Sequence, residues 1–137
     1  MDEMRDFAER YTAAWNSQDP TQVADFFTEE GVLTINGGIP HEGRDAIAEV
    51  VAGFMTAFPD LVIYFDSLEE DGERFNYHWT FIGTNTGDGG TGQEVDFSGY
   101  EAWLMGDDGL VTDSLGNFDA EEYARQLEHG VGEDDTA

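Results

Sequence analysis

The stretch that decides the fold is RFNYHWTFIGT, residues 74–84, in which polar and large apolar side chains alternate. The apolar members share one parity and the polar members share the other: Phe75, Tyr77, Trp79 and Phe81 against Arg74, Asn76, His78 and Thr80. Successive side chains of a β-strand point to opposite faces of the sheet. The pattern therefore predicts a strand with one buried face.

Strands are also predicted on both sides of this stretch. They are Leu61 to Glu69, Val95 to Met105 and Leu110 to Asn117. Short turns that contain glycine, at 71–72 and 106–109, connect neighbouring members of the set. Strands joined in this way pair antiparallel, so we expect one continuous sheet from residue 61 to residue 117.

The first part of the chain is predicted to be mainly helical. Apolar residues at helical spacing indicate helices over Asp2–Ser17, from Pro20 through Val23, Phe26 and Phe27, and over Asp45–Phe58. A strand is predicted at Val32–Asn36, followed by a loop over residues 37–43. Asp19 and Asp119 are of the residue type that caps helix N-termini, so the second and the last helix are predicted to begin beside them.

The predicted order of elements is thus α-α-β-α-β-β-β-β-α. Long hairpin strands that wrap around helices belong to the α+β class, here with a curved, cone-shaped antiparallel or mixed sheet. Such a sheet leaves a hollow that is lined by alternating strand residues and by the first helix. We predict one domain over residues 1–130, followed by an acidic flexible tail over 131–137.

The charge of the chain excludes several classes of function. It has 137 residues, with 31 Asp and Glu against 5 Lys and Arg, and a net charge of −26. All five basic residues are arginines, so we expect no binding to nucleic acid and none to anionic membranes. The complete lack of lysine is typical of cytosolic proteins of halophiles that accumulate salt. We therefore predict a halophilic, cytoplasmic protein; the alternative is an acidic protein of a mesophile.

The numbers and positions of cysteine, histidine and glycine bear on which disulfides, metal sites and phosphate sites can be predicted. The chain lacks cysteine, which excludes a disulfide framework, a thiolate metal site and a thiol nucleophile. Its three histidines are too dispersed to predict a metal centre. The glycine-rich loop 87–92 contains Asp88 and is not followed by a helix, so it does not predict a phosphate site. We expect no metal and no cofactor.

Several short motifs resemble those of a known family. The run 11–19, YTAAWNSQD, and the later run 43–47, GRDAI, are similar to the nuclear transport factor 2-like superfamily. Within it, residues 58–61 (FPDL), 83–87 (GTNTG) and Asp119 with Gln126-Leu127 resemble SnoaL-like polyketide cyclases. The resemblance covers the chain from about Phe7 to Gly130. It implies the cone-shaped fold, which is also described as cystatin-like, and intramolecular aldol ring closure without metal or cofactor.

The resemblance points to Asp119 as the catalytic residue. Its position matches that of the family's catalytic aspartate, at the end of the last strand, and apolar Leu115 and Phe118 are expected to desolvate it. The alternative is purely structural, because Asp119 is also a suitable N-cap for the last helix.

Glu101 is the second catalytic candidate, because it interrupts an aromatic strand. It shares parity with Phe97 and Trp103, which predicts that it faces the hollow beside substrate-binding aromatic rings. In the related ketosteroid isomerases, an acid at the corresponding position stays protonated and donates to an oxyanion. The alternative is that Glu101 faces solvent, as most glutamates do.

Five other residues are predicted to shape the site. Tyr11 and Trp15 lie near the family's tyrosine of the first helix, and Asn36 and Asn117 are expected to orient a substrate carbonyl. Asn36 stands where the isomerases carry their proton-shuttling aspartate, and an amide cannot abstract a proton, so steroid isomerisation is disfavoured. His78 is predicted either to bind substrate or to lie at a sheet-to-sheet contact. Because all five arginines are expected on helices or at a strand edge, the arginine–aspartate triad of epoxide hydrolysis is not predicted.

Two classes of function follow from these observations. The first is cofactor-free acid–base chemistry, of the cyclase, isomerase or lyase type, on a small hydrophobic or carbonyl-bearing molecule. The alternative is a non-catalytic domain that binds such a molecule or serves mainly to dimerise. In either case we expect a homodimer through the open face of the sheet, which light scattering in high salt would detect.

The acidic composition predicts that salt stabilises the protein. Carboxylates repel one another across about 8 Å at physiological salt but only about 3 Å near 1 M, because the Debye length shortens. The melting temperature is therefore expected to keep rising as KCl increases from physiological to molar concentration, as measured by thermal unfolding. A melting temperature that stays flat over this range would contradict the halophile prediction.

Overall fold

The computed structural model describes residues 2–131, which form four α-helices and six β-strands. In chain order they are α1 (Asp2–Asn16), α2 (Pro20–Ala24), β1 (Phe27–Ile35), β2 (His41–Glu42), α3 (Arg44–Ala57), β3 (Val62–Asp71), β4 (Arg74–Thr84), β5 (Glu94–Met105), β6 (Val111–Phe118) and α4 (Ala120–His129). The predicted tail lies outside the described residues, apart from its first position. None of the helices within residues 2–131 has the length and apolar character needed to cross a membrane.

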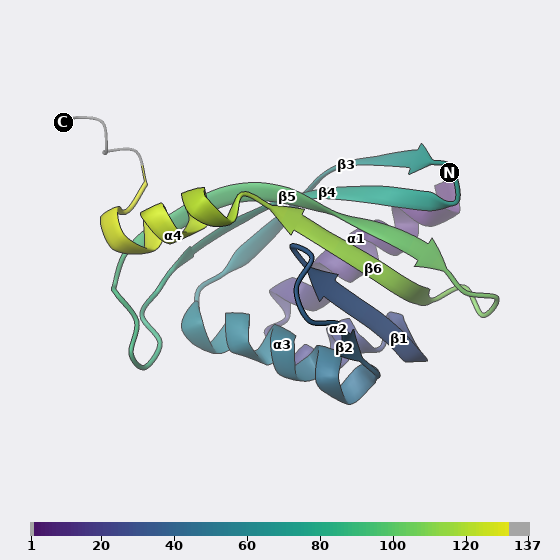
Figure 1. The fold of residues 1–137 in the computed structure, drawn as a ribbon, viewed down its shortest axis with the longest axis horizontal. Helices are drawn as coiled ribbons and strands as arrows, with labels where there is room; N and C mark the ends of the chain where they lie inside the picture. Colours follow the sequence, from purple (N-terminus) through teal and green to yellow (C-terminus); the bar gives the residue numbers. More distant parts are fainter. Residues whose placement is uncertain (1, 132–137) are drawn as a thin grey trace.

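The strands form one curved, mixed sheet in the order β2-β1-β6-β5-β4-β3. β1 runs parallel to β6, and every other neighbouring pair is antiparallel. Figure 1 shows α1, α2 and α3 on one side of this sheet and α4 at the end where β6 finishes. The predicted α+β class, with a mixed sheet wrapped around helices, is confirmed.

The first strand and the loop after it differ from the prediction. β1 begins at Phe27 and not at Val32, because Phe27 already pairs with Val111 of β6. Phe27 is therefore a strand residue, and the second helix ends before it. The strand register is irregular around Gly31, where a Cβ atom would lie 3.0 Å from the Val111 carbonyl oxygen. The predicted loop 37–43 contains β2, residues 41–42, which adds an edge strand to β1.

Aromatic packing joins α1 to the inner face of the sheet. Tyr77 and Trp103 stack with ring centroids 4.8 Å apart. Tyr11 packs edge-on against both rings, at 5.4 Å and 5.2 Å. Phe7, one helical turn earlier, packs edge-on against Trp103 at 5.3 Å. None of these four side chains is more than 5% exposed, so they form the centre of the core and confirm the inward parity predicted for residues 74–84.

Gln126 joins α4 to the edge of β5 by hydrogen bonds to the main chain. β6 ends opposite Gly99, so the preceding part of β5 has no strand beside it on this side. Gln126 takes the place of a strand there: its Oε1 accepts a hydrogen bond from the Asp96 N–H at 2.7 Å, and its Nε2 donates to the Asp96 carbonyl oxygen at 3.1 Å. The side chain is 4% exposed. This docking places Tyr123 of α4 against Phe97, with ring centroids 4.9 Å apart.

Replacing Gln126 by alanine is expected to destabilise the protein by about 1–3 kcal/mol, because the backbone groups of Asp96 would lose their buried partners. The matched control is Glu128→Ala on the same helix, whose side chain is 73% exposed. This control should change stability by no more than about 0.5 kcal/mol. Urea unfolding in molar KCl measures both effects. Equal losses of stability in the two variants would show that the hydrogen bonds of Gln126 make no specific contribution.

Candidate functional site

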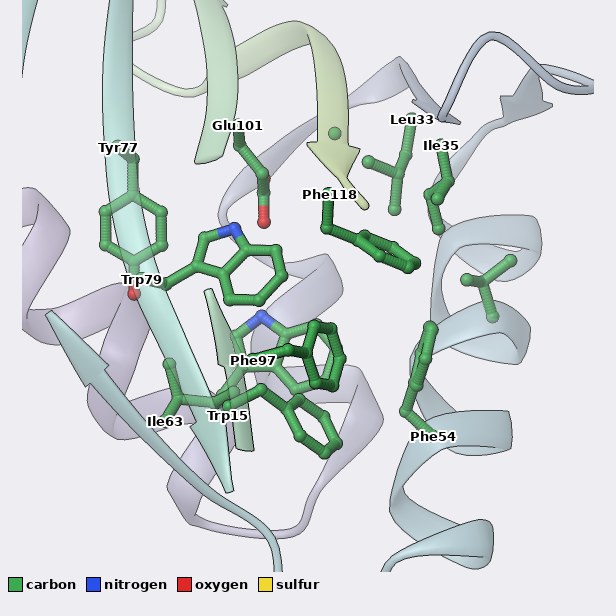
Figure 2. Close-up of a pocket in the computed structure, with 13 residues that line it drawn as sticks. Trp15, Leu33, Ile35, Phe54, Ile63, Tyr77, Trp79, Phe97, Glu101 and Phe118 are labelled. Carbon is green, nitrogen blue, oxygen red and sulfur yellow. The ribbon is translucent and has the colours of Figure 1, made fainter. Parts of the chain in front are cut away.

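A cavity of about 60 Å³ lies between the inner face of the sheet and helices α1 and α3. We call it the inner cavity, and Figure 2 shows the side chains that converge on it. Its thirteen lining residues are Trp15, Leu33, Ile35, Val50, Phe54, Ile63, Tyr77, Trp79, Phe81, Phe97, Glu101, Gly116 and Phe118. A single water needs about 10–15 Å³ of such space, so the cavity can hold a few waters or a compact organic group.

Glu101 contributes the one carboxyl group of this lining, and Figure 2 shows its side chain directed among the aromatic rings. It is 8% exposed. The Trp103 indole N–H and the Ser114 hydroxyl each donate to Glu101 Oε1 at 2.9 Å. The Tyr11 hydroxyl donates to both oxygens, at 3.1 Å to Oε1 and 3.0 Å to Oε2. Oε1 therefore has three donors, whereas Oε2 has one and keeps hydrogen-bonding capacity for a ligand.

Burial controls the protonation of this group. Loss of hydration raises the pKa of Glu101 above its usual value, and the hydrogen bonds from Trp103, Ser114 and Tyr11 oppose that rise only in part. Burial also raises the pKa of Tyr11, and the neighbouring Glu101 raises it further. The two groups therefore favour their neutral forms. Because Trp103 and Ser114 point their hydrogens at Oε1, a proton on this carboxyl group belongs on Oε2.

Local sequence patterns explain how these side chains reach the site. Tyr11 and Trp15 are four residues apart on α1, which places them on one face of the helix, Tyr11 behind Glu101 and Trp15 in the lining. On β5, Phe97, Glu101 and Trp103 all face inward. Gly99 lies between them, and a Cβ atom there would be 2.7 Å from Cζ2 of Trp79. Glycine at this position therefore lets the Trp79 indole lie against β5.

Asp119 stands outside the inner cavity. It is exposed, and its Oδ1 accepts hydrogen bonds from the N–H groups of Glu121 and Glu122, both at 3.1 Å. This is the geometry of an N-cap for α4. Leu115, which was expected to desolvate it, is 39% exposed, because the inner parity of β6 belongs to Ser114, Gly116 and Phe118. The cavity thus does not bring Asp119 and Glu101 together.

Five other predicted site residues are also absent from the lining of the inner cavity. Tyr11 and Trp103 are donors to Glu101, and the other three lie farther away. Asn36 is exposed after β1, where its Oδ1 accepts from the Phe118 N–H at 2.9 Å. Asn117 lines a groove on the outer face of the sheet and donates to the Leu115 carbonyl oxygen. His78 faces outward as well, with its Nε2 3.2 Å from Glu69 Oε1. Their positions follow from strand parity, which directs His78 and Asn117 away from the helices.

Ser114 is a site residue that was not predicted from the sequence. It is fully buried, but a serine between Asp113 and Leu115 carries no signal of its own. Its role depends on the register of β5 and β6, which places it opposite Trp103. Phe81 and Phe118 were predicted only as a core and a neighbouring residue, although they line the cavity. Within residues 2–131, no group of three or more His, Asp or Glu side chains is arranged to hold a metal ion.

Comparisons with known proteins agree with this architecture. Residues 8–114 match the family model of the SnoaL-like domain. Among solved structures, AclR from Streptomyces galilaeus aligns with a TM-score of 0.77 at 22% identity, covering 94% of this chain and 98% of its own. The epoxide hydrolase/cyclase-like enzyme SalBIII aligns with a TM-score of 0.75 at 18% identity, covering 88% and 94%. A nuclear transport factor 2-like protein from Exiguobacterium aligns with a TM-score of 0.70 at 21% identity, covering 82% and 98%. No curated protein matches the chain.

Replacing Glu101 by glutamine is expected to stabilise the protein increasingly as the pH rises. The folded chain holds the Glu101 proton to a higher pH than the unfolded chain, whose glutamates have a pKa of about 4.3. The stability linked to this proton is complete below that value and is lost as the pH rises through the raised pKa of the folded state. Glutamine does not titrate, so the advantage of Glu101→Gln should grow above about pH 4.3.

Urea unfolding from pH 5 to pH 8 in molar KCl measures this difference. Glu121→Gln, at an exposed position of α4, is the reference for removing one surface charge. A difference between native chain and Glu101→Gln that does not depend on pH would contradict the expectation.

Proposed function

This chain belongs to the SnoaL-like domain family, and on that premise we propose that its inner cavity binds a small, largely apolar molecule that carries a carbonyl group. Glu101 performs acid–base chemistry on this molecule without a cofactor, and the reaction is a ring closure or isomerisation. The observation that carries the proposal is the buried carboxyl group of Glu101, with one oxygen held by three donors and the other left available to a ligand.

The number of carboxyl groups limits the reaction. Ring closure of an enol onto a carbonyl forms one carbon–carbon bond, delivers one proton to the attacked oxygen and removes one from the enol oxygen. Glu101 Oε2–H donates to the carbonyl oxygen and transfers its proton as negative charge develops there. The resulting carboxylate then accepts the proton that the enol loses. The substrate keeps its proton count, so a single carboxyl group is sufficient.

The donors to Oε1 support both halves of this cycle. Hydrogen bonds from Trp103, Ser114 and Tyr11 stabilise the carboxylate that forms after proton transfer, and burial favours return of the proton. Asp119 has no part in this scheme, because it caps α4 outside the cavity. The neighbour SalBIII is an epoxide hydrolase/cyclase-like enzyme with a role in pyran ring formation, which is ring-closing chemistry on a similar fold.

A second candidate function is binding without turnover. It is favoured by the position of Asp119, which matches the family's catalytic aspartate but caps α4 outside the cavity. The cavity volume of about 60 Å³ is less than half of the roughly 150 Å³ that holds a benzene molecule in an engineered protein cavity. Side chains at the half-buried rim, such as Trp15, Phe54 and Phe118, would have to move to admit a larger ring. The predicted homodimer through the outer face of the sheet is compatible with either function and stays a prediction.

Hydrogen–deuterium exchange of a ketone distinguishes the two functions. The protein is expected to accelerate exchange of the methyl protons of cyclopropyl methyl ketone in heavy water, followed by proton NMR. Donation of the Oε2 proton to the ketone oxygen and removal of a methyl proton by the resulting carboxylate would give the enol, and Glu101 plays the same acid and base roles there as in the ring closure. Glu101→Gln should reduce this acceleration by a factor of about 10²–10⁴, since the amide still donates a hydrogen bond but transfers no proton.

Glu121→Gln is the control and should exchange the ketone like the native chain. Equal acceleration by Glu101→Gln and the native chain would remove Glu101 from the mechanism. A ketone that binds but exchanges no faster than in buffer would support the binding domain.

A further inference from the structure

The lining of the inner cavity contains no positive charge. Of its thirteen residues, Glu101 and Tyr77 are the ones with an ionisable side chain, and neither can carry a positive charge. The Tyr77 hydroxyl is already hydrogen-bonded to the Thr12 hydroxyl. A ligand carboxylate in this cavity would therefore lose its hydration and meet no cation in return.

All five arginines of the chain are bound elsewhere. Arg10 pairs with Asp6 and Arg125 pairs with Glu122, each within one helix. Arg74 pairs with Asp113 across the sheet. Arg44 donates to the Phe27 carbonyl oxygen, and Arg5 lies over the Phe65 ring. The chain has no lysine. Burying an unpaired carboxylate costs several kcal/mol. A small rearrangement of the lining would bring no cation to offset this cost, so it would not allow an anion to bind.

The lining also contains two indole N–H groups, those of Trp15 and Trp79. The Trp79 indole N–H can donate to a ligand but cannot accept, whereas the Trp15 indole N–H already donates to the Tyr11 hydroxyl.

Two side-chain oxygens of the lining can still accept. They are Glu101 Oε2 and the Tyr77 hydroxyl oxygen, because the Thr12 hydroxyl donates to the Ala8 carbonyl oxygen and Tyr77 is therefore the donor to Thr12. A primary ammonium group has three hydrogens to place, so at least one of them would find neither acceptor. The aromatic faces attract cations, but they do not replace these hydrogen bonds.

From this donor set we propose that the inner cavity is selective for charge: it takes an uncharged ligand whose polar atoms accept hydrogen bonds, and it rejects carboxylates and ammonium groups. The inference rests on the proposed function, because it names the substrate class of the same site. It also bears on the preceding step of the reaction sequence. Whatever reaction supplies the substrate must leave neither a free carboxylate nor a free amine at the end that enters the cavity.

Three probes of nearly equal shape test this selectivity. They are cyclopropyl methyl ketone, cyclopropanecarboxylate and cyclopropylmethylammonium, which are neutral, negative and positive at pH 7. Each is titrated into ¹⁵N-labelled protein in molar KCl while the indole N–H signals of the three tryptophans are followed. Trp15 and Trp79 line the cavity, and Trp103 donates to Glu101, so these signals report on the site directly.

The ketone is expected to shift the signals with a dissociation constant at least about tenfold lower than either ion, which corresponds to about 1.4 kcal/mol. In Glu101→Gln, ketone binding should be retained, because the amide N–H₂ takes over the donation. The carboxylate should still be rejected there, since the substitution adds no cation. Rejection of the carboxylate by Glu101→Gln would show that the lack of a cation, and not repulsion by the Glu101 carboxylate, excludes the anion.

Carboxylate or ammonium binding equal to that of the ketone would overturn the charge selectivity and leave the proposed site in place. If none of the three probes shifts the indole signals at millimolar concentration, the cavity is not a ligand site. That outcome would overturn the proposed function and this inference with it.

Discussion

A carboxyl group buried among aromatic rings must find hydrogen-bond donors inside the protein, and in this chain that constraint organises the interior. Glu101 takes its donors from three elements: Tyr11 from α1, Trp103 from its own strand β5, and Ser114 from β6. Two of these donors, Tyr11 and Trp103, also belong to the aromatic centre of the core, where they pack against Tyr77. Helix placement, strand register and the chemistry of the cavity therefore depend on one another.

The molecule separates its charges sharply. Thirty-one acidic residues make the chain strongly negative, yet the cavity lining contains a single carboxyl group, which burial keeps toward its neutral form. Surface carboxylates gain from salt through screening, whereas a group removed from water gains little. The chemistry that we propose thus depends on one oxygen atom, Glu101 Oε2, in surroundings where screening by salt has little effect.

Much of the fold was predictable, because its signals are local. Alternation over residues 74–84 assigned the inner and outer faces of β4, and Asp19 and Asp119 marked the starts of α2 and α4. The site was less predictable. The inward direction of Glu101 could be inferred from Phe97 and Trp103 on the same strand. The catalytic role predicted for Asp119, in contrast, came from the family resemblance, and the surroundings of Asp119 depend on β6. There the inner parity carries Ser114 and Gly116, whereas apolar Leu115 faces outward.

The sequence by itself determined the class of fold, the faces of its main strands, the starts of its second and last helices and the acidic character of the surface. Each of these depends on residues close together in the chain. Only the tertiary structure decided which carboxyl group faces the cavity and what surrounds it. Tyr11 lies 90 positions from Glu101 and Ser114 lies 13 away, so the spacing along the chain could not bring them together. Their meeting follows from the register of β5 with β6 and from the packing of α1 on the sheet, both of which arise from contacts distant in sequence.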